Sequence, residues 1–136
     1  MATPAELSGV RDTVTVRLPA TSAYLSVLRT ATAGLAARLD FTLDEIEDLR
    51  IAVDEACAML LTQAEPDVDL QCTFELHGDA MRVAVSVRTL DGSEPARGTF
   101  AWTVLNSLAG EVDAHASPDG LVTIELHKRR EQTRSA

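Results

Sequence analysis

A helical segment that begins at Thr42 constrains the fold more than any other feature of the sequence. Thr42 and Glu45 have the spacing of a capping box, in which each side chain hydrogen-bonds the backbone N–H of the other residue. Acidic residues crowd the first turns, where the positive end of the helix dipole favours them. Apolar residues then recur every three or four positions, at Ile46, Leu49, Val53, Ala56 and Leu60. The pattern predicts a helix that ends near Gln63, before Pro66, and that buries one continuous face.

Turn residues and hydrophobic periodicity divide the rest of the chain into further elements. Alternation of apolar and polar residues predicts strands, and recurrence at helical spacing predicts helices. The expected elements are a strand at 13–18, a helix at 21–39 capped by Thr21 or Ser22, strands at 69–76 and 81–89, a helix at 99–108, and strands at 111–117 and 121–128. Because hairpins dominate, the sequence predicts an α+β fold: a two-layer sandwich in which three helices cover one face of a mostly antiparallel sheet of about five strands.

The chain has the size of one domain and an uneven distribution of charge. Its 136 residues, 46% of them hydrophobic, suffice for a single core. We expect an N-terminal arm at 1–11, one domain at 12–128 and a poorly ordered basic tail at 129–136. From Lys128 onward there are four basic residues and one acid, so residues 1–127 hold 8 basic and 20 acidic residues, a net charge of −12. Such a body repels nucleic-acid phosphates and suits a basic protein partner.

Several classes of protein are disfavoured by what the sequence lacks. It has no run of about 18 apolar residues and its first residues do not resemble a secretory signal, so we expect a cytoplasmic protein without a membrane span. Cys57 and Cys72 lack the spacing of a disulfide framework or a metal site, and we expect two buried, reduced thiols. Hydrolase, P-loop and zinc-protease motifs are absent. We expect His77, His115 and His127 at the surface, and no metal site.

Asp54 and Glu55 lie near the middle of the helix that follows Thr42. Glu55 comes four residues after Ile51, which places it on an edge of the helix rather than on its back. A carboxylate at such an edge can act as a general base if the neighbouring sheet shields it from water. It can equally be a solvated acid on an acidic helix. The spacing alone leaves both interpretations open.

The segment L-D-F-T-L-D-E-I-E-D-L-R-I-A-V-D-E-A, Leu39 to Ala56, resembles the helix that bears the N-box of GHKL-type (Bergerat-fold) ATPases. It is similar above all to the anti-sigma factor kinases of the RsbW type found in bacteria. The likeness extends to L-P-A-T-S-A-Y-L-S-V-L-R, Leu18 to Arg29, to G-T-F-A-W-T-V-L-N-S-L-A-G-E-V, Gly98 to Val112, and to the final hairpin. The resemblance covers most of the chain and implies the Bergerat, GHKL-like form of the sandwich.

The resemblance gives a role to Glu55 and shows a departure at Met59. The family's N-box glutamate, which acts as the base in phosphoryl transfer, falls on Glu55. The N-box asparagine, which holds Mg²⁺ against the nucleotide phosphates, falls four residues later on Met59. A thioether is a weak, soft acceptor and cannot replace a hard oxygen ligand of Mg²⁺. The catalytic role of Glu55 is therefore expected to be vestigial.

The nucleotide-binding motif after the strand at 81–89 is also incomplete. The family places an Asp on the adenine amine in a D-x-G-x-G pattern, and Thr89 stands at that Asp when the segments are aligned without a gap. With a shift, Asp91 and Gly92 supply an Asp and one glycine at the wrong spacing. The family's long lid over the phosphates is reduced to residues 93–97, and the second glycine at the entry to the next helix is missing.

These departures imply a degenerate kinase that requires no cofactor. Phosphoryl transfer depends on metal and electrostatic positioning, and loss of the Mg²⁺ ligand removes a main part of it. We expect little or no kinase activity. ATP and Mg²⁺ are expected only if residual affinity remains, and Glu55, Asp91 and Gly92 are the positions to test first.

The resemblance also implies a surface for protein partners. In the family, an arginine on the first helix contacts both the sigma factor and its antagonist, and that position is Arg29. A guanidinium fork fits carboxylates on a partner. Tyr24 and Leu25 are expected to belong to this partner-binding surface or, with Leu28, to a homodimer interface like that of related kinases; packing on the sheet is the alternative.

The function implied is that of an anti-sigma factor, which sequesters an alternative, stress-type sigma factor. A STAS-domain anti-anti-sigma factor would release it by competing for the same surface. Neither nucleic acid nor a membrane is an expected partner. Two alternatives stay open: an active serine kinase that phosphorylates its STAS antagonist, which Glu55 alone motivates, and a degenerate regulator of another transcription or signalling protein.

Overall fold

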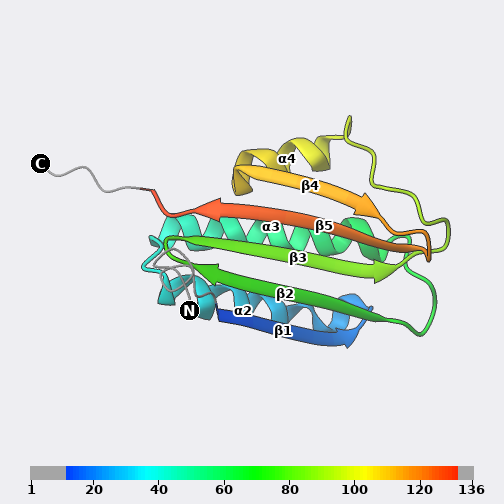
Figure 1. The fold of residues 1–136 in the computed structure, drawn as a ribbon, viewed down its shortest axis with the longest axis horizontal. Coiled ribbons are helices and arrows are strands. Elements are labelled where there is room, and N and C mark those ends of the chain that lie inside the picture. The colour runs from blue at the N-terminus through cyan, green and yellow to red at the C-terminus, as the bar shows by residue number, and fades with distance from the viewer. Residues whose placement is uncertain (1–11, 132–136) are drawn as a thin grey trace, which may run out of the picture.

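A computed structural model describes residues 12–131 of the chain (Figure 1). In chain order the elements are β1 (Asp12–Pro19), the 3-10 helix η1 (Ser22–Tyr24), α2 (Leu25–Arg38), α3 (Leu43–Leu61), β2 (Asp69–His77), β3 (Ala80–Arg88), α4 (Phe100–Ala109), β4 (Glu111–Ala116) and β5 (Leu121–Arg129). The order predicted from the sequence is confirmed. None of the helices within residues 12–131 combines the length and the apolarity that crossing a bilayer requires.

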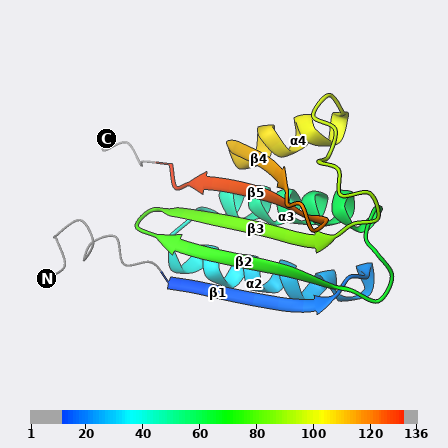
Figure 2. The same ribbon diagram turned by 45° about the vertical axis from the view of Figure 1, so that its right-hand side comes forward.

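The sheet has five strands in the order β1-β2-β3-β5-β4, and each neighbouring pair is antiparallel. Helices α2 and α3 lie side by side across one face of the sheet, and α4 packs against α3 near β4 and β5 (Figures 1 and 2). Three helices therefore cover a single face. The predicted α+β, two-layer sandwich is confirmed.

The core lies between α3 and the middle of the sheet. Leu49, Val53 and Leu60 of α3 are almost completely buried, as are Phe74 of β2 and Ile124 of β5. These are positions of the apolar face expected from the helical spacing, and alternate residues of the strands meet them because successive strand side chains point to opposite faces. Burying one such aliphatic side chain contributes about 1.5–3 kcal/mol.

Both cysteines are part of this core. Cys57 of α3 and Cys72 of β2 are fully buried. Burial, with a smaller effect from the charge of Asp54, raises the pKa of Cys57 to about 12. Burial also raises the pKa of Cys72. Because the thiolate is the reactive form, burial disfavours reaction of both thiols near neutral pH, and the predicted burial of the two cysteines is confirmed.

The capping box at the start of α3 is present as predicted, and it has an additional partner. Glu45 accepts a hydrogen bond from the Thr42 N–H at 2.8 Å, and the Thr42 hydroxyl accepts one from the Glu45 N–H at 3.1 Å. The second carboxylate oxygen of Glu45 accepts from the Glu131 N–H at 2.7 Å. The segment after β5 is thereby attached to the start of α3. Residues 1–11 and 132–136, which belong to the predicted arm and tail, lie outside the described residues.

The first helix begins differently from the prediction. No side-chain cap forms at Thr21, and the N-cap position of α2 is Tyr24, which also provides no side-chain cap. Instead the Thr21 N–H bonds the Pro19 carbonyl at 2.7 Å, and the Tyr24 N–H bonds the Thr21 carbonyl at 3.3 Å. The prediction that Thr21 or Ser22 caps this helix is therefore wrong, because backbone carbonyls in a tight turn satisfy these donors.

Candidate functional site

The residues assigned to nucleotide chemistry are gathered at one end of the sheet. They come from the C-terminal half of α3, the loop after β3 and the start of α4. These three segments lie at the end where β3 finishes and the β4–β5 turn begins (Figure 1). The fold therefore brings to one end of the sheet the segments that carry the residues named by the resemblance.

On α3, Glu55 and Met59 are both half-buried and follow each other by about one turn. Met59 packs against the hydrophobic core, and its carbonyl accepts a hydrogen bond from the Thr62 hydroxyl at 2.8 Å. Within residues 12–131, Glu55 has no ion-pair partner. The Glu55 carboxylate thus lies at the predicted edge of the helix, one turn before the Met59 thioether. The resemblance expects a hard oxygen ligand of Mg²⁺ at position 59.

In the loop after β3, Thr89 is buried and belongs to a compact turn. Its N–H bonds the Gly120 carbonyl at 3.0 Å, and its hydroxyl accepts a hydrogen bond from the Gly92 N–H at 2.8 Å. Gly92 has φ +66°, and a Cβ there would stand 3.4 Å from the Gly120 Cα, so the turn favours glycine. The Thr89 side chain, which the resemblance places at the adenine-binding position, therefore hydrogen-bonds the backbone of its own loop.

Asp91 is also held by neighbours within the protein. One carboxylate oxygen accepts the Ser93 N–H at 3.0 Å. In the orientation that satisfies both groups, the Gln63 amide donates to the two Asp91 oxygens at 3.1 and 3.2 Å. The backbone carbonyl of Gln63 accepts a hydrogen bond from the Leu90 N–H at 2.9 Å. These bonds tie the loop to the end of α3.

Side-chain hydrogen bonds fix the start of α4 and the loop before it. The Thr99 hydroxyl caps the helix by accepting from the Trp102 N–H at 3.2 Å. Arg97 lies over the Trp102 ring, 5.0 Å from its centroid, and donates to Asp113 at 3.0 Å and to the Ala114 carbonyl at 2.9 Å. The hydrogen bond from the Ala114 N–H lowers the pKa of Asp113, and the hydrogen bond from Arg97 lowers it further. The short segment that stands in place of a lid is thus attached to β4.

The residues predicted to contact partner proteins lie on the helical layer. Arg29 of α2 donates from Nε to Asp54 of α3 at 2.7 Å, and their side chains are 44% and 34% exposed. Tyr24, Val27 and Ile51 are exposed large apolar residues on the same two helices and η1. Sequence reasoning singled out Arg29 and Tyr24 for this surface, but it missed that Asp54 is the partner of Arg29.

Two of the residues considered for this surface are in the core. Leu25 is 7% exposed and Leu28 is fully buried. The prediction that Leu25 contacts a partner is corrected, because its side chain packs with the core cluster instead. For these two leucines the alternative stated from the sequence, packing on the sheet, is confirmed.

Relatives place the chain in a family. No family model matches it. The serine-protein kinase RsbW of Halalkalibacterium halodurans is 30% identical over 121 residues, which cover 75% of this chain and 75% of the relative. The chain belongs to the RsbW family. The anti-sigma-F factor RsbW of Mycobacterium tuberculosis is 35% identical over 104 residues, which cover 76% of this RsbW-family chain and 61% of the relative.

The same family appears among solved structures. The crystal structure of the RsbU and RsbW domains of Rv1364c from Mycobacterium tuberculosis matches this chain with a TM-score of 0.72 at 18% identity. The match covers 90% of this chain and 33% of that one, so the RsbW-family chain spans about a third of the solved protein. The likeness supports the fold assignment.

Proposed function

We propose that the chain is an anti-sigma factor that binds and sequesters an alternative, stress-type sigma factor. A STAS-domain anti-anti-sigma factor releases the sigma factor by competing for an overlapping surface on α2 and α3. Relatives at 30% and 35% identity are named serine-protein kinase RsbW and anti-sigma-F factor RsbW, which supports these kinds of partner. Because the two complexes exclude each other, their relative affinities and concentrations set the amount of free sigma factor.

The observation that carries this proposal is the environment of Arg29. Its Nε bonds Asp54 at 2.7 Å, and within residues 12–131 its two terminal nitrogens have no hydrogen-bond partner. Exposed apolar side chains of Tyr24 and Val27 lie on the same stretch of chain. A guanidinium with free donors beside apolar residues has the composition of an interface anchor, which can bind a partner carboxylate with two parallel hydrogen bonds.

The proposal includes inefficient or absent phosphoryl transfer. Three features support this: Met59 packs against the core at the position that the resemblance gives to the metal ligand, Thr89 bonds Gly92 at the position that it gives to the adenine-binding Asp, and Arg97 attaches the short loop to β4. Without a Mg²⁺ ligand or a lid, the site lacks charge neutralisation and exclusion of water, two of the means by which phosphoryl transfer is accelerated. The protein then acts by occlusion alone. A homodimer with Tyr24 at its interface and a cytoplasmic location belong to the same proposal.

A catalytic alternative is favoured by one specific observation. Glu55 is half-buried on α3, at the position of the family's base, and within residues 12–131 no cation neutralises it. The alternative is an ATP-dependent kinase that phosphorylates a serine of its STAS antagonist. It requires Mg-ATP to bind and the STAS protein to gain phosphate, and mass spectrometry of the antagonist after incubation detects that modification directly.

A pull-down with both partner proteins tests the proposed surface. Arg29→Glu reverses the charge at the centre of the surface, and Arg38→Glu makes the same change at the exposed C-terminal end of α2. We expect Arg29→Glu to abolish capture of the sigma factor and of the STAS protein, while Arg38→Glu retains both. Retention of both partners by Arg29→Glu rejects the surface. Sedimentation velocity on the Tyr24→Ala variant tests the dimer, which should shift toward monomer.

A further inference from the structure

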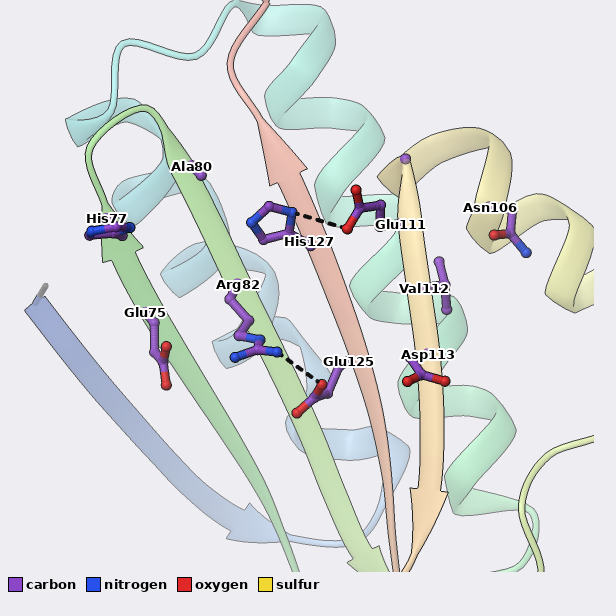
Figure 3. A pocket seen from close by; sticks show the side chains of 11 residues that line it. Glu75, His77, Ala80, Arg82, Asn106, Glu111, Val112, Asp113, Glu125 and His127 are labelled. Atoms are coloured by element: carbon purple, nitrogen blue, oxygen red, sulfur yellow. Dashed lines mark hydrogen bonds and ion pairs between the residues drawn. The ribbon is translucent and has the colours of Figure 1, made fainter. Parts of the chain in front are cut away.

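Residues 128–131, at the end of β5 and directly after it, bond the ends of α2, α3 and α4. The last residue of β5, Arg129, pairs with Ala80 beside the β2–β3 turn (Figure 3). The connection between α2 and α3 lies at this same end of the sheet (Figures 1 and 2). One short segment thus reaches three helices that come from different parts of the sequence.

Two side chains of this segment bond the carbonyl ends of helices. Lys128 Nζ donates to the Leu108 carbonyl in the last turn of α4 at 2.9 Å. Arg130 Nη1 donates to the carbonyl of Leu39, the C-cap residue of α2, at 3.1 Å. The last carbonyls of a helix have no partner within the helix, and they carry the negative end of its dipole. Each cation therefore satisfies a group that its helix leaves open.

The backbone of the segment bonds the beginning of the third helix. The Glu131 N–H donates to one carboxylate oxygen of Glu45 at 2.7 Å, and the Thr42 N–H donates to the other at 2.8 Å. Glu45 is only 4% exposed. Removing a donor from a buried charged group costs more than the bond itself contributes, because water does not replace the donor. The start of α3 therefore depends on a donor that lies 86 positions away in the chain.

The segment itself is held in place at the β2–β3 turn. The Arg130 N–H donates to the Asp79 carbonyl at 2.7 Å, and the Arg129 guanidinium lies 3.3 Å from the Asp79 carboxylate. On its other side Arg130 lies 3.9 Å from the carboxylate of Asp40. Asp40 has φ +58°, a conformation that residues other than glycine adopt at a cost. A strained connection between α2 and α3 is thus secured from outside.

We propose that residues 128–131 are a clasp that controls local opening of the α2–α3 connection, residues 39–46. When the clasp is closed, the connection and the first turn of α3 are fixed. When Arg130 and Glu131 are withdrawn, residues 39–46 open while the sheet and the core stay folded. The opening stays local because the fully buried apolar side chains of α3 begin only at Leu49.

The clasp makes the helical layer responsive to the chain that follows it. A partner that draws away the chain beyond residue 131 opens the α2–α3 connection without contacting either helix. Arg29 lies near the start of α2 and Asp54 in the second half of α3, so both are far along their helices from the clasp. The inference therefore goes beyond the proposed sigma-factor surface and does not depend on it.

Amide hydrogen exchange in the full chain, followed by NMR, tests the clasp. Glu131→Pro removes the N–H that bonds Glu45, whereas the control Glu131→Ala keeps it and changes only an exposed side chain. We expect the Thr42 and Glu45 amides to exchange at least fivefold faster in Glu131→Pro and within twofold of normal in Glu131→Ala. Equal rates in all three proteins overturn the proposal. Equal acceleration in the amides of β2, β3 and β5 also overturns it, because the whole fold is then destabilised.

A second pair of variants tests the side-chain half of the clasp, and it decides the question alone if Glu131→Pro does not fold. Arg130→Ala removes the donor to the Leu39 carbonyl, and Arg38→Ala removes an exposed cation from the last turn of the same helix. Amides 39–41 should exchange at least threefold faster in Arg130→Ala and within twofold of normal in Arg38→Ala. Equal effects contradict the proposal, because they reflect charge near the helix end and not the clasp. Arg29→Glu is expected to leave exchange in residues 39–46 unchanged, so failure of this inference is distinguishable from failure of the sigma-factor proposal.

Discussion

Asp54 competes with any partner carboxylate for Arg29, so Asp54→Asn is expected to tighten partner binding. The Arg29–Asp54 bond of 2.7 Å joins side chains that are 44% and 34% exposed. At such exposure an ion pair is worth about 0.5–1 kcal/mol after solvent screening. Releasing that interaction before association corresponds to roughly a two- to fivefold gain in affinity. The asparagine has the same shape, so packing on α3 is preserved.

Surface plasmon resonance with the immobilised sigma factor measures this effect. Glu47→Gln is the matched control, because Glu47 forms a similar exposed ion pair with Arg50 on the same helix at 2.8 Å. The control should change the affinity by less than twofold. In the double variant Arg29→Ala/Asp54→Asn the gain should disappear, since the group that Asp54 restrains is gone. Weaker binding by Asp54→Asn than by the unmodified protein refutes the reasoning, because it means that the intact pair, rather than free Arg29, is recognised.

Three further perturbations test the fold and the site. Thr42→Ala removes one side of the capping box and should lower the free energy of unfolding by about 1 kcal/mol in urea denaturation; an unchanged midpoint contradicts the capping role. Although burial opposes its ionisation, hydrogen bonds from the Thr42 and Glu131 N–H groups lower the pKa of Glu45 below 4.5. The contribution of ionised Glu45 to the free energy of unfolding is therefore complete above pH 4.5 and is lost as the pH falls through the lowered pKa. The free energy of unfolding should consequently decline less on acidification in Glu45→Gln than in the unmodified protein. Arg97→Ala should red-shift the emission of Trp102, the sole tryptophan, and speed amide exchange in residues 90–99, with a smaller change in Arg97→Lys; identical spectra mean that Arg97 does not secure the loop.

Much of the fold was predictable because its strongest determinants are local. The capping box at Thr42 and Glu45 and the apolar steps of α3 depend on residues a few positions apart, and the structure has both. The hairpins follow from alternation and turn residues. The 3-10 start of the first helix was not predictable in this way, because backbone bonds in the turn after Pro19 decide it and they leave no pattern in the side chains.

The candidate site was predictable only as a set of residues. Resemblance located Glu55, Met59 and Thr89, but the contacts that give the site its present form join distant segments. Arg97 reaches Asp113 across 16 positions and Arg29 reaches Asp54 across 25. Helical periodicity fixes the face on which a residue lies, but it does not fix the register of α2 against α3, which decides the Arg29–Asp54 pair. Nor does it fix how the loop before α4 lies against β4, which decides the Arg97–Asp113 pair.

Calorimetric titration of Mg-ATP into the unmodified protein tests the central claim most directly. The claim is that the chain keeps the fold of a nucleotide-binding family while Met59, Thr89 and the short loop deprive it of the metal and phosphate contacts. The account predicts no saturable heat up to about 1 mM nucleotide, the upper end of ordinary KM values. A dissociation constant below about 0.1 mM, well inside that range, contradicts the account and restores the kinase as the primary function.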